Sequence, residues 1–489
     1  MNGLNIPALI VIIAYLILST GLIIYNGRKV KTFKDFAIGG GTMPWYVIAV
    51  TMAVAVVGGG VMMGYVGDFY NMGLMFFWMP VSLFVSWLIM AFFISARIRR
   101  LNVFTMADIF AKRFGENTRV IAGLINVIAG VGVSFAMLNS FASFLNSFVG
   151  VPLLTGRIIG AIIFVLSTTL GGFKGVAWIC LMQSVFLFGG AIVVGVASIF
   201  RVGGFDALVA GLPNDFLSMF HFSTAPGGNL HAPMIFFGMV ISAAAIGLAD
   251  QAVMFQRINA ARTPEDAQKA TKVFAFFTFL VFFFILAIGL SARVVLGYDP
   301  TLGRNAIIGQ FLLQLNPVFS LTYAAAIVCA VVTTANAMYL SAGMTFSRDL
   351  VSRFKPDLPD KTLLMLSRVF IVFAAAVGVV VTNFSPVIMT WTLFVYVCIF
   401  CLIIPLYGGL LFKRATPASG VLSLAFSIIG VLIWDGFGPF FGIHAVFIAL
   451  VLGLFGFFLG FAFKGGVTAE QHAMVDTFKG KVTATKDAS

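Results

Sequence analysis

Charged residues are scarce in this sequence. Only 10% of its 489 residues are Asp, Glu, Lys or Arg, against about 25% in an ordinary soluble domain. Apolar residues make up 61% of the chain, and the mean hydropathy is +1.07. No fold in water can bury so many apolar side chains, which excludes a soluble enzyme or a soluble binding domain. The protein is therefore expected to lie in lipid.

Cysteine and histidine are also scarce, with four of each. The cysteines lie in apolar runs, with no CxxC pair and no histidine close by, so neither a disulfide nor a zinc site is expected. The sequence also has no His–Glu zinc pattern, no serine triad and no paired intramembrane carboxylates. We therefore expect no catalytic residues, no prosthetic group and no enzymatic activity within the membrane.

Long apolar runs fill almost the whole chain. A hydrocarbon core about 30 Å thick needs about 20 apolar residues per helix, whereas a β-barrel would show short alternating segments. The sequence thus predicts an all-α polytopic membrane protein. The first run has no cleavage site after it and is expected to be a retained helix. The runs predict about thirteen spans, at 4–25, 44–66, 73–96, 118–149, 152–171, 175–200, 232–255, 270–296, 317–346, 363–383, 386–412, 417–437 and 440–463.

The net charge of +13 has two readings. A basic protein can bind nucleic acid, but basic residues in membrane proteins gather in cytoplasmic loops. With the N-terminus outside and the C-terminus in the cytoplasm, the inner connections hold nearly all of the 30 basic residues. We therefore expect a multi-pass protein of the cell (inner) membrane, with the lipid bilayer and no nucleic acid as a partner. The basic residues left outside are Arg157, Arg201, Arg293 and Arg304.

A long connection at 201–231 divides the spans into two sets of five. Because each set has an odd number of spans, the two sets necessarily have opposite orientations in the membrane. That permits an inverted repeat, and transporters with such repeats bind their solute near the midplane between broken helices. The first half is predicted to consist of an extra N-terminal helix with an inner loop (1–43), a first repeat (44–200) and an outer loop (201–231). The second half is predicted to consist of an inverted second repeat (232–412), two extra helices (413–464) and a cytoplasmic tail (465–489).

Three consecutive glycines at 58–60 interrupt the second span. Glycine costs about 0.5 to 1 kcal/mol against alanine in a helix interior. Unwound main chain at this depth is tolerated where it lines a cavity, and its carbonyls can then bind a cation. Close helix packing through small residues is the alternative. We favour unwinding, because the first span of the second half is similarly rich in small residues at 238–247.

Two threonines in the ninth span are candidate cation ligands. Because positions three and four apart share a helix face, the carbonyl of Ala330 and the hydroxyls of Thr333 and Thr334 can converge on one point. Threonines in membrane helices also bond back to their own helix, so the pattern alone leaves the alternatives open. Among carboxylates, Asp68 and Asp250 lie near helix ends and are candidate functional or gate residues.

Several short motifs occur in a specific order along almost the whole chain. They are DFAIGGGTMPW at 35–45, MGYVG at 63–67, RIRRL at 97–101, TMAD at 105–108, GGFKGVAW at 171–178, DQ at 250–251, QR at 256–257, SRD at 347–349 and LLFKR at 410–414. In this order and spacing the chain resembles the sodium:solute symporter family, the group of the proline, pantothenate, sialic acid and glucose symporters. The resemblance implies a LeuT-like bundle with an inverted five-plus-five helix repeat.

The resemblance also implies one sodium site, as a transported ion. Two positions depart from the family, since Cys180 and Val56 stand where relatives can have aspartate. We therefore expect one sodium per solute, with proton coupling on the same fold as an alternative. The implied sodium ligands are the carbonyls of Val54, Val57 and Ala330 and the hydroxyls of Thr333 and Thr334.

The implied function is a sodium-coupled secondary active symporter. It would import a small polar organic solute, such as an amino acid, a vitamin or a carboxylate, by alternating access, with a monomer as the functional unit. A solute-sensing membrane protein with vestigial transport is the other alternative, although such sensors usually carry a signalling domain. The candidate solute-binding residues are Gly58, Gly59, Gly60, Met63, Trp78, Asn139, Ser242, Ala243, Gly247 and Trp391.

Overall fold

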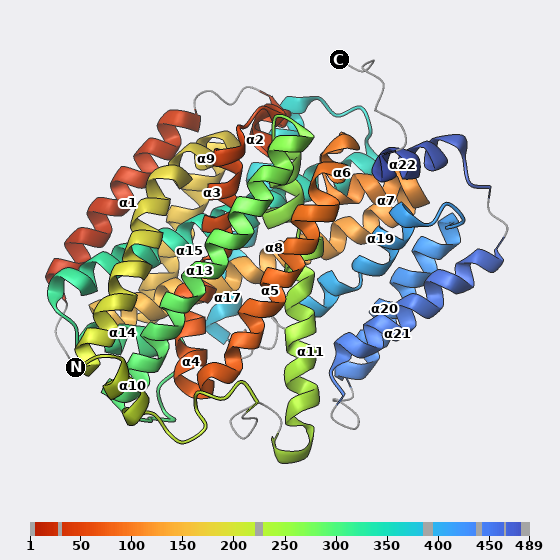
Figure 1. Cartoon of the computed structure of the whole chain (residues 1–489). Helices are drawn as coiled ribbons and strands as arrows, with labels where there is room; N and C mark the ends of the chain where they lie inside the picture. The colour runs from red at the N-terminus through yellow and green to blue at the C-terminus, as the bar shows by residue number, and fades with distance from the viewer. Residues whose placement is uncertain are drawn as a thin grey trace.

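A computed structural model describes residues 5–27, 32–220, 228–384, 395–436, 443–463 and 466–480. In these ranges the chain is helical, and the extended pairing is a single isolated bridge between Met43 and Ala261. Figure 1 shows one bundle of helices. The expected all-α class is confirmed.

The helices of the first half alternate between long apolar rods and short connecting pieces. They are α1 (Ile6–Gly27), α2 (Phe33–Ile38), α3 (Trp45–Val56), α4 (Val66–Met72), α5 (Trp78–Ile89), α6 (Ser95–Arg100), α7 (Met106–Phe114), α8 (Glu116–Phe144), α9 (Leu153–Val202) and α10 (Phe205–Gly211).

The second half repeats this alternation. Its helices are α11 (Gly228–Ala249), α12 (Gln256–Ala260), α13 (Pro264–Leu296), α14 (Ile307–Leu312), α15 (Pro317–Thr345), α16 (Ser352–Phe354), α17 (Asp360–Phe384), α19 (Ile403–Leu411), α20 (Pro417–Gly436), α21 (Ala445–Leu459) and α22 (Ala469–Lys479). In Figure 1, α1 and the pair α20–α21 lie on opposite flanks of the bundle. One end of the bundle carries α2, α6, α7 and α22, and the other carries α4, α10 and α14. We call these the α7 end and the α14 end.

Ten of the described helical segments are long and apolar enough to cross a membrane, and two apolar helices are shorter, at Trp45–Val56 and Val395–Leu411. The predicted spans 152–171 and 175–200 form one 50-residue helix, α9, that bends at Gly172. Gly172 has a φ of 56°, in the left-handed region that suits glycine. A Cβ here would also meet the ring of Phe36. The bend therefore separates two spans without a loop between them.

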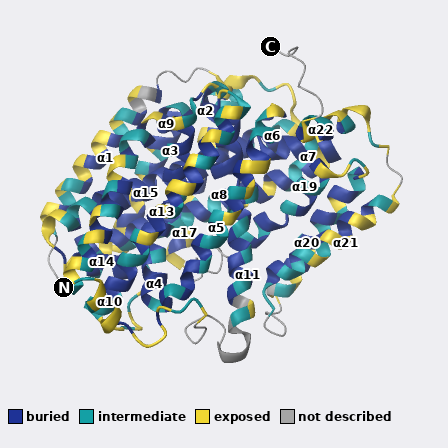
Figure 2. Ribbon diagram, viewed as in Figure 1, coloured by how far each residue is buried: buried dark blue, intermediate teal, exposed yellow. Residues whose placement is uncertain are grey.

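Burial separates the central helix from the outer ones. In the span that contains α15, 78% of the apolar window is buried, against 28% for α17 and 33% for α1. Figure 2 shows the buried residues in the middle of the bundle and exposed residues toward its flanks. Many exposed side chains on the outer helices are apolar, such as Ile17, Val185 and Phe373. Such a surface is suited to lipid, whereas α15 and the segment Phe236–Ala260, at 78% and 72% buried, lie in the interior.

Candidate functional site

The predicted interruption of the second span is present at the glycine run. Helix α3 ends at Val56, and helical structure resumes as a π-helical turn, η2 (Gly60–Tyr65), before α4. The N–H of Val57 donates to the carbonyl of Ala53 at 2.9 Å, and the next bonds are donated by Val61 and Met62 to the carbonyl of Gly58, at 3.0 and 2.9 Å. The carbonyls between these two sets of bonds lie at a helix end, where oxygens lack the usual helical donors.

Thr334 of the central helix α15 lies against this interruption. Its hydroxyl donates to the carbonyl of Ala55 at 3.0 Å, although the two residues are 279 positions apart in the sequence. A Cβ built on Gly58 would collide with the Thr334 side chain, and one on Gly59 would meet Val331 of the same helix. The glycines therefore let α15 approach the broken segment closely, so unwinding and close packing occur together.

The predicted sodium ligands come from these two elements. Val54, Val57 and Ala330 are fully buried, and Thr333 and Thr334 nearly so. The hydroxyl of Thr333 bonds within its own helix, to the carbonyls of Cys329 at 2.8 Å and Ala330 at 3.1 Å. Of the two threonines, Thr334 is therefore the one whose hydroxyl contacts the broken helix.

The first helix of the second half is also broken, but not where the small residues are. Helix α11 runs to Ala249, Asp250 is extended with φ −74° and ψ 119°, and a π-helical turn, η7 (Gln251–Phe255), follows. The carboxylate of Asp250 accepts the N–H of Val253 at 2.5 Å, so it caps the new turn. The run of small residues at 238–247 lies within α11, before this break. Small residues there serve packing, since a Cβ on Gly247 would collide with Ser86.

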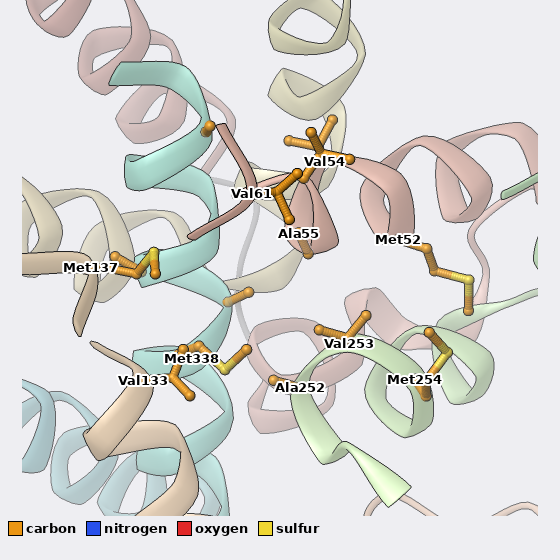
Figure 3. Close-up of a cluster of buried hydrophobic side chains, with 14 of the residues drawn as sticks. Met52, Val54, Ala55, Val61, Val133, Met137, Ala252, Val253, Met254 and Met338 are labelled. Atoms are coloured by element: carbon orange, nitrogen blue, oxygen red, sulfur yellow. The ribbon is translucent and has the colours of Figure 1, made fainter. Parts of the chain in front are cut away.

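A cavity of about 510 Å³ lies between the two broken helices. It extends to the α14 end, where its wall includes residues of the segment 303–306. In Figure 3 the broken α3 segment, with Ala55 and Val61, lies beside Met137, Met338 and Val253. The polar side chains of the cavity wall are Tyr65, Asp68, Asn139, Ser140, Ser143, Asp250, Arg304, Asn305, Thr334 and Tyr396.

Two carboxylates reach this cavity, and only one of them forms a direct ion pair among the described residues. Asp68 forms an ion pair with Arg304, whose Nε also donates to the carbonyl of Gly64 at 3.2 Å. The pair lies toward the α14 end and joins the broken helix to the segment before α14. Asp250 caps the second break without an ion pair. The cavity thus combines a neutralised pair with a separate acceptor.

Comparison with known proteins agrees with this geometry. The profile of the sodium:solute symporter family matches residues 36–409. The chain belongs to the sodium:solute symporter family.

Relatives within the sodium:solute symporter family share the length of the chain to different degrees. The sodium/pantothenate symporter of Escherichia coli is 24% identical, over 97% of this chain and 100% of its own length. The sodium/glucose cotransporter of Vibrio parahaemolyticus is 23% identical, over 88% of this chain and 82% of its own. The chain spans 60% of the mouse sodium/glucose cotransporter 4, at 23% identity over 77% of this chain. These relatives are transporters, not enzymes.

Solved structures show the family fold. A Na⁺-coupled sialic acid symporter in a substrate-bound, outward-open state matches with a TM-score of 0.80 at 18% identity, covering 93% of this chain and 96% of that one. The transporter MhsT in complex with L-phenylalanine matches with a TM-score of 0.56 at 16% identity, over 85% of this chain and 97% of that one. The expected LeuT-like bundle with an inverted repeat is confirmed.

The structure places only some of the predicted solute-binding residues of this symporter at the cavity. Gly58, Gly60 and Asn139 line it. Trp78 instead donates to the carbonyl of Met219 at 3.0 Å and packs against Phe220 and Phe237. The remaining described candidates are not part of the cavity wall, namely Gly59, Met63, Ser242, Ala243 and Gly247. Trp391 lies outside the described residues.

Sequence reasoning missed most of the second half's contribution to the cavity. From α11 and η7 the wall receives Met239, Ile246 and Val253 beside Asp250. The hydroxyl of Ser242 is bonded to the carbonyl of Gly238 at 2.8 Å, within α11. Spacings of seven, four and three residues separate Met239, Ile246, Asp250 and Val253, and such spacings repeat one helix face. That spacing could have indicated these residues, but we predicted solute binding at the small residues between them, Ser242, Ala243 and Gly247.

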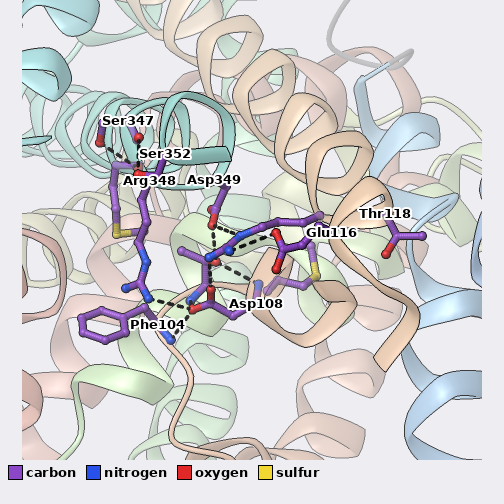
Figure 4. Close-up of polar contacts among 12 residues, drawn as sticks. Phe104, Asp108, Glu116, Thr118, Ser347, Arg348, Asp349 and Ser352 are labelled. Atoms are coloured by element: carbon purple, nitrogen blue, oxygen red, sulfur yellow. Dashed lines mark hydrogen bonds and ion pairs between the residues drawn. The ribbon is translucent and has the colours of Figure 1, made fainter. Parts of the chain in front are cut away.

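The α7 end of the symporter is held by a charged cluster, shown in Figure 4. Arg119 of α8 contacts Asp108 of α7 at 2.5 Å and Asp349 at 3.2 Å, the latter in a π-helical turn, η8 (Phe346–Val351), that follows α15. Arg348 contacts Asp108 at 3.5 Å and stacks on Phe104 at 3.8 Å. Asp349 is fully buried, and buried charges need such partners. The cluster therefore ties α7 and α8 to the end of α15.

The same end is linked to the second break. Gln251, the residue after Asp250, accepts the N–H of Met106 at 2.7 Å through its side-chain oxygen. Met106 is the first residue of α7, and Thr105 before it donates to Asp349 at 3.1 Å. This hydrogen bond joins the cavity-lining break directly to the first turn of α7.

Replacing Arg119 with alanine should release α7. Removing one partner of a buried ion pair costs about 3 to 5 kcal/mol, and here two acids lose the same guanidinium. We expect amide hydrogen exchange in α7 to rise at least tenfold, since local opening sets the exchange rate. Lys112→Ala removes a positive charge from an exposed position of α7 and is the matched control. Equal exchange in the two variants would show that the cluster does not hold this helix.

Proposed function

We propose that the chain is a sodium-coupled secondary active symporter that imports a small polar organic solute by alternating access. The observation that carries the proposal is the contact between Thr334 and the carbonyl of Ala55 at the broken helix, beside the cavity. Neutral oxygens from an unwound segment and a neighbouring helix suit a monovalent cation. The relatives named as sodium symporters and the family profile support the same ion.

The proposed ligands are the carbonyls of Val54, Val57 and Ala330 with the hydroxyls of Thr334 and Thr333. Thr333 must then turn from the carbonyls of its own helix toward the break. The cation would lie between α3 and α15, so its binding would draw together two elements that belong to different repeats. Such a contact gives sodium a preference for one arrangement of the bundle, which is what coupling requires.

We propose one sodium per solute. Position 180 is a buried cysteine, and Val56 at the first break lines the cavity without a charge. A second cation at either place would have no carboxylate from these residues. In the membrane, the proposed arrangement has the α7 end in the cytoplasm and the N-terminus outside, following the distribution of basic residues.

Proton coupling is the second candidate function, and Asp250 is the observation that favours it. Its carboxylate lies at a helix break in the cavity wall, and an intramembrane carboxylate can carry a proton in transporters. Sodium is preferred because the oxygens at Thr334 and Ala55 are neutral and cannot exchange a proton in the ordinary pH range.

Sodium and solute should each tighten the other's binding, because linkage makes the coupling reciprocal. Thermal stability of the purified chain against amino acids, glucose and pantothenate, each with and without sodium, would identify a binding solute. We expect that solute's affinity to rise with sodium, with a Hill coefficient near one. A solute affinity that does not depend on sodium but changes steeply with pH would show that the coupling ion is a proton. A Hill coefficient near two would contradict the single site.

A further inference from the structure

Asn139 in the cavity wall has one end of its side-chain amide already engaged. Its oxygen accepts a hydrogen bond from Arg157 at 3.1 Å, and Arg157 donates on its other branch to the side-chain oxygen of Asn383 at 2.9 Å. Arg157 is only 8% exposed. An amide whose oxygen is bonded to a guanidinium has its NH₂ group left for other partners. At the cavity, Asn139 is therefore a hydrogen-bond donor.

Asp250 in the same wall has the opposite character. An ionised carboxylate only accepts hydrogen bonds, and the N–H of Val253 occupies one of its oxygens. The nearby guanidinium of Arg257 is directed elsewhere, to the carbonyls of Thr51 at 3.0 Å and of Ala252. Asp250 is 6% exposed, and Arg257 is close enough to act on its charge but donates its hydrogen bonds to main-chain carbonyls instead. An ammonium group in the cavity would donate to this carboxylate directly.

The rest of the wall is apolar and adaptable. Met137, Met338 and Val133 lie together across from the broken helices in Figure 3, and Met79 and Met239 also line the cavity. Methionine side chains are flexible and polarisable, so they fit apolar groups of varied shape. The cavity wall therefore combines a donor, an anionic acceptor and an apolar surface.

We propose that the solute is an amino-acid-type zwitterion. Its ammonium group binds Asp250, its carboxylate accepts from the amide of Asn139, and its apolar body packs against Met137 and Met338. Arg157 is a positioning residue, since it contacts Asn139 and sets which amide atom faces the solute. This inference rests on the proposed function, because it names the solute of that same symporter.

The test uses the purified full-length chain and matched compounds. Each L-amino acid is compared with the analogue that lacks its ammonium group and with the amine that lacks its carboxylate, alongside glucose, myo-inositol and pantothenate. We expect the strongest thermal stabilisation from an amino acid, with at least tenfold weaker binding of the analogue that lacks ammonium. If an amine-free compound binds most tightly, or no amino acid binds, the proposal is overturned.

Asp250→Asn separates this proposal from the sodium site. We expect the variant to bind the best amino acid at least tenfold more weakly, while stabilisation by sodium chloride over choline chloride is unchanged. Retained amino-acid affinity would overturn the role of Asp250, and so would a loss of sodium stabilisation, which would make the carboxylate a cation site. If the amino acid binds the unaltered chain independently of sodium, symport fails while the solute assignment stands.

Arg157→Met tests the positioning role. Without the guanidinium, the Asn139 amide can rotate and present its oxygen to the solute carboxylate. Affinity for the amino acid should fall about tenfold, a loss of about 1.4 kcal/mol, while affinity for the matched amine without a carboxylate stays within twofold. A structural defect would weaken both compounds equally, and that result would overturn the role assigned to Arg157.

Discussion

Replacing Thr334 with alanine should lower the apparent sodium affinity of transport at least tenfold. The Thr334 hydroxyl lies 3.0 Å from the Ala55 carbonyl at the helix break, so its loss removes one neutral oxygen from the proposed ion site. A hydrogen bond to a charged group is worth about 1.5 to 3 kcal/mol, and 1.4 kcal/mol is about a factor of ten. Initial uptake rates in proteoliposomes over a series of sodium concentrations measure the effect. Solute affinity at saturating sodium should barely change.

Three further substitutions separate the oxygen from the shape of the side chain. Thr334→Ser keeps the oxygen and should be tolerated, whereas Thr334→Val keeps the shape and should behave like alanine. Thr322→Val is the matched control on α15, because the Thr322 hydroxyl bonds to Val318 of the same helix at 2.7 Å in an exposed position. Wild-type sodium dependence in Thr334→Val would mean that this hydroxyl only links the two helices, and the proposed sodium site would be wrong.

The first break could be predicted because its cause is local. Three glycines in a row weaken any helix, whatever surrounds it, and α3 does end at Val56. The contact of Thr334 with that break was predictable only through the family resemblance. Spacing within α15 places Thr333 and Thr334 next to Ala330, but nothing in that spacing distinguishes a hydroxyl that reaches across to Ala55 from one that bonds back to Cys329.

The second break could not be located from composition. A run of small residues is compatible with unwinding and with tight packing. Which of the two occurs depends on the helix that packs against the run. Gly247 packs so closely against Ser86 of α5 that a Cβ would collide with it, and its segment stays helical. The main chain becomes extended three residues later, at Asp250, whose side chain can cap the next turn. The charged cluster at the α7 end depends equally on distant contacts, since Arg119 and Asp349 are 230 residues apart.

The position of Trp78 relative to the cavity depends on geometry rather than chemistry. An aromatic residue at the start of a span can face either the bundle interior or the connection beside it. In the structure its indole N–H donates to the carbonyl of Met219, in the connection before α11, and Phe220 packs on the ring. Indole groups commonly combine apolar packing with one hydrogen bond in this way. The solute cavity consequently takes its aromatic wall from other positions, including Phe76.

Replacing Gly58 with alanine should reduce sodium-dependent uptake at least tenfold while the protein still folds. The added methyl group would collide with the Thr334 side chain, so α15 must move away from the break or the break must shift. Overpacking of this kind costs about 1 to 3 kcal/mol, and here it acts on the contact that is proposed to bind sodium. Uptake in proteoliposomes and thermal stability of the purified variant measure the two effects separately.

Gly189→Ala is the control, because it adds the same methyl group to a helix glycine, in α9, that is not part of the cavity wall. A Cβ on Gly189 would meet nothing within 4 Å. Its uptake should therefore stay within twofold of the unaltered protein. If Gly58→Ala and Gly189→Ala transported equally well, close approach of α15 to the break would not be required for coupling. The Thr334 hydroxyl would then not be needed as a sodium ligand in its present position, because the added methyl group forces that side chain to shift.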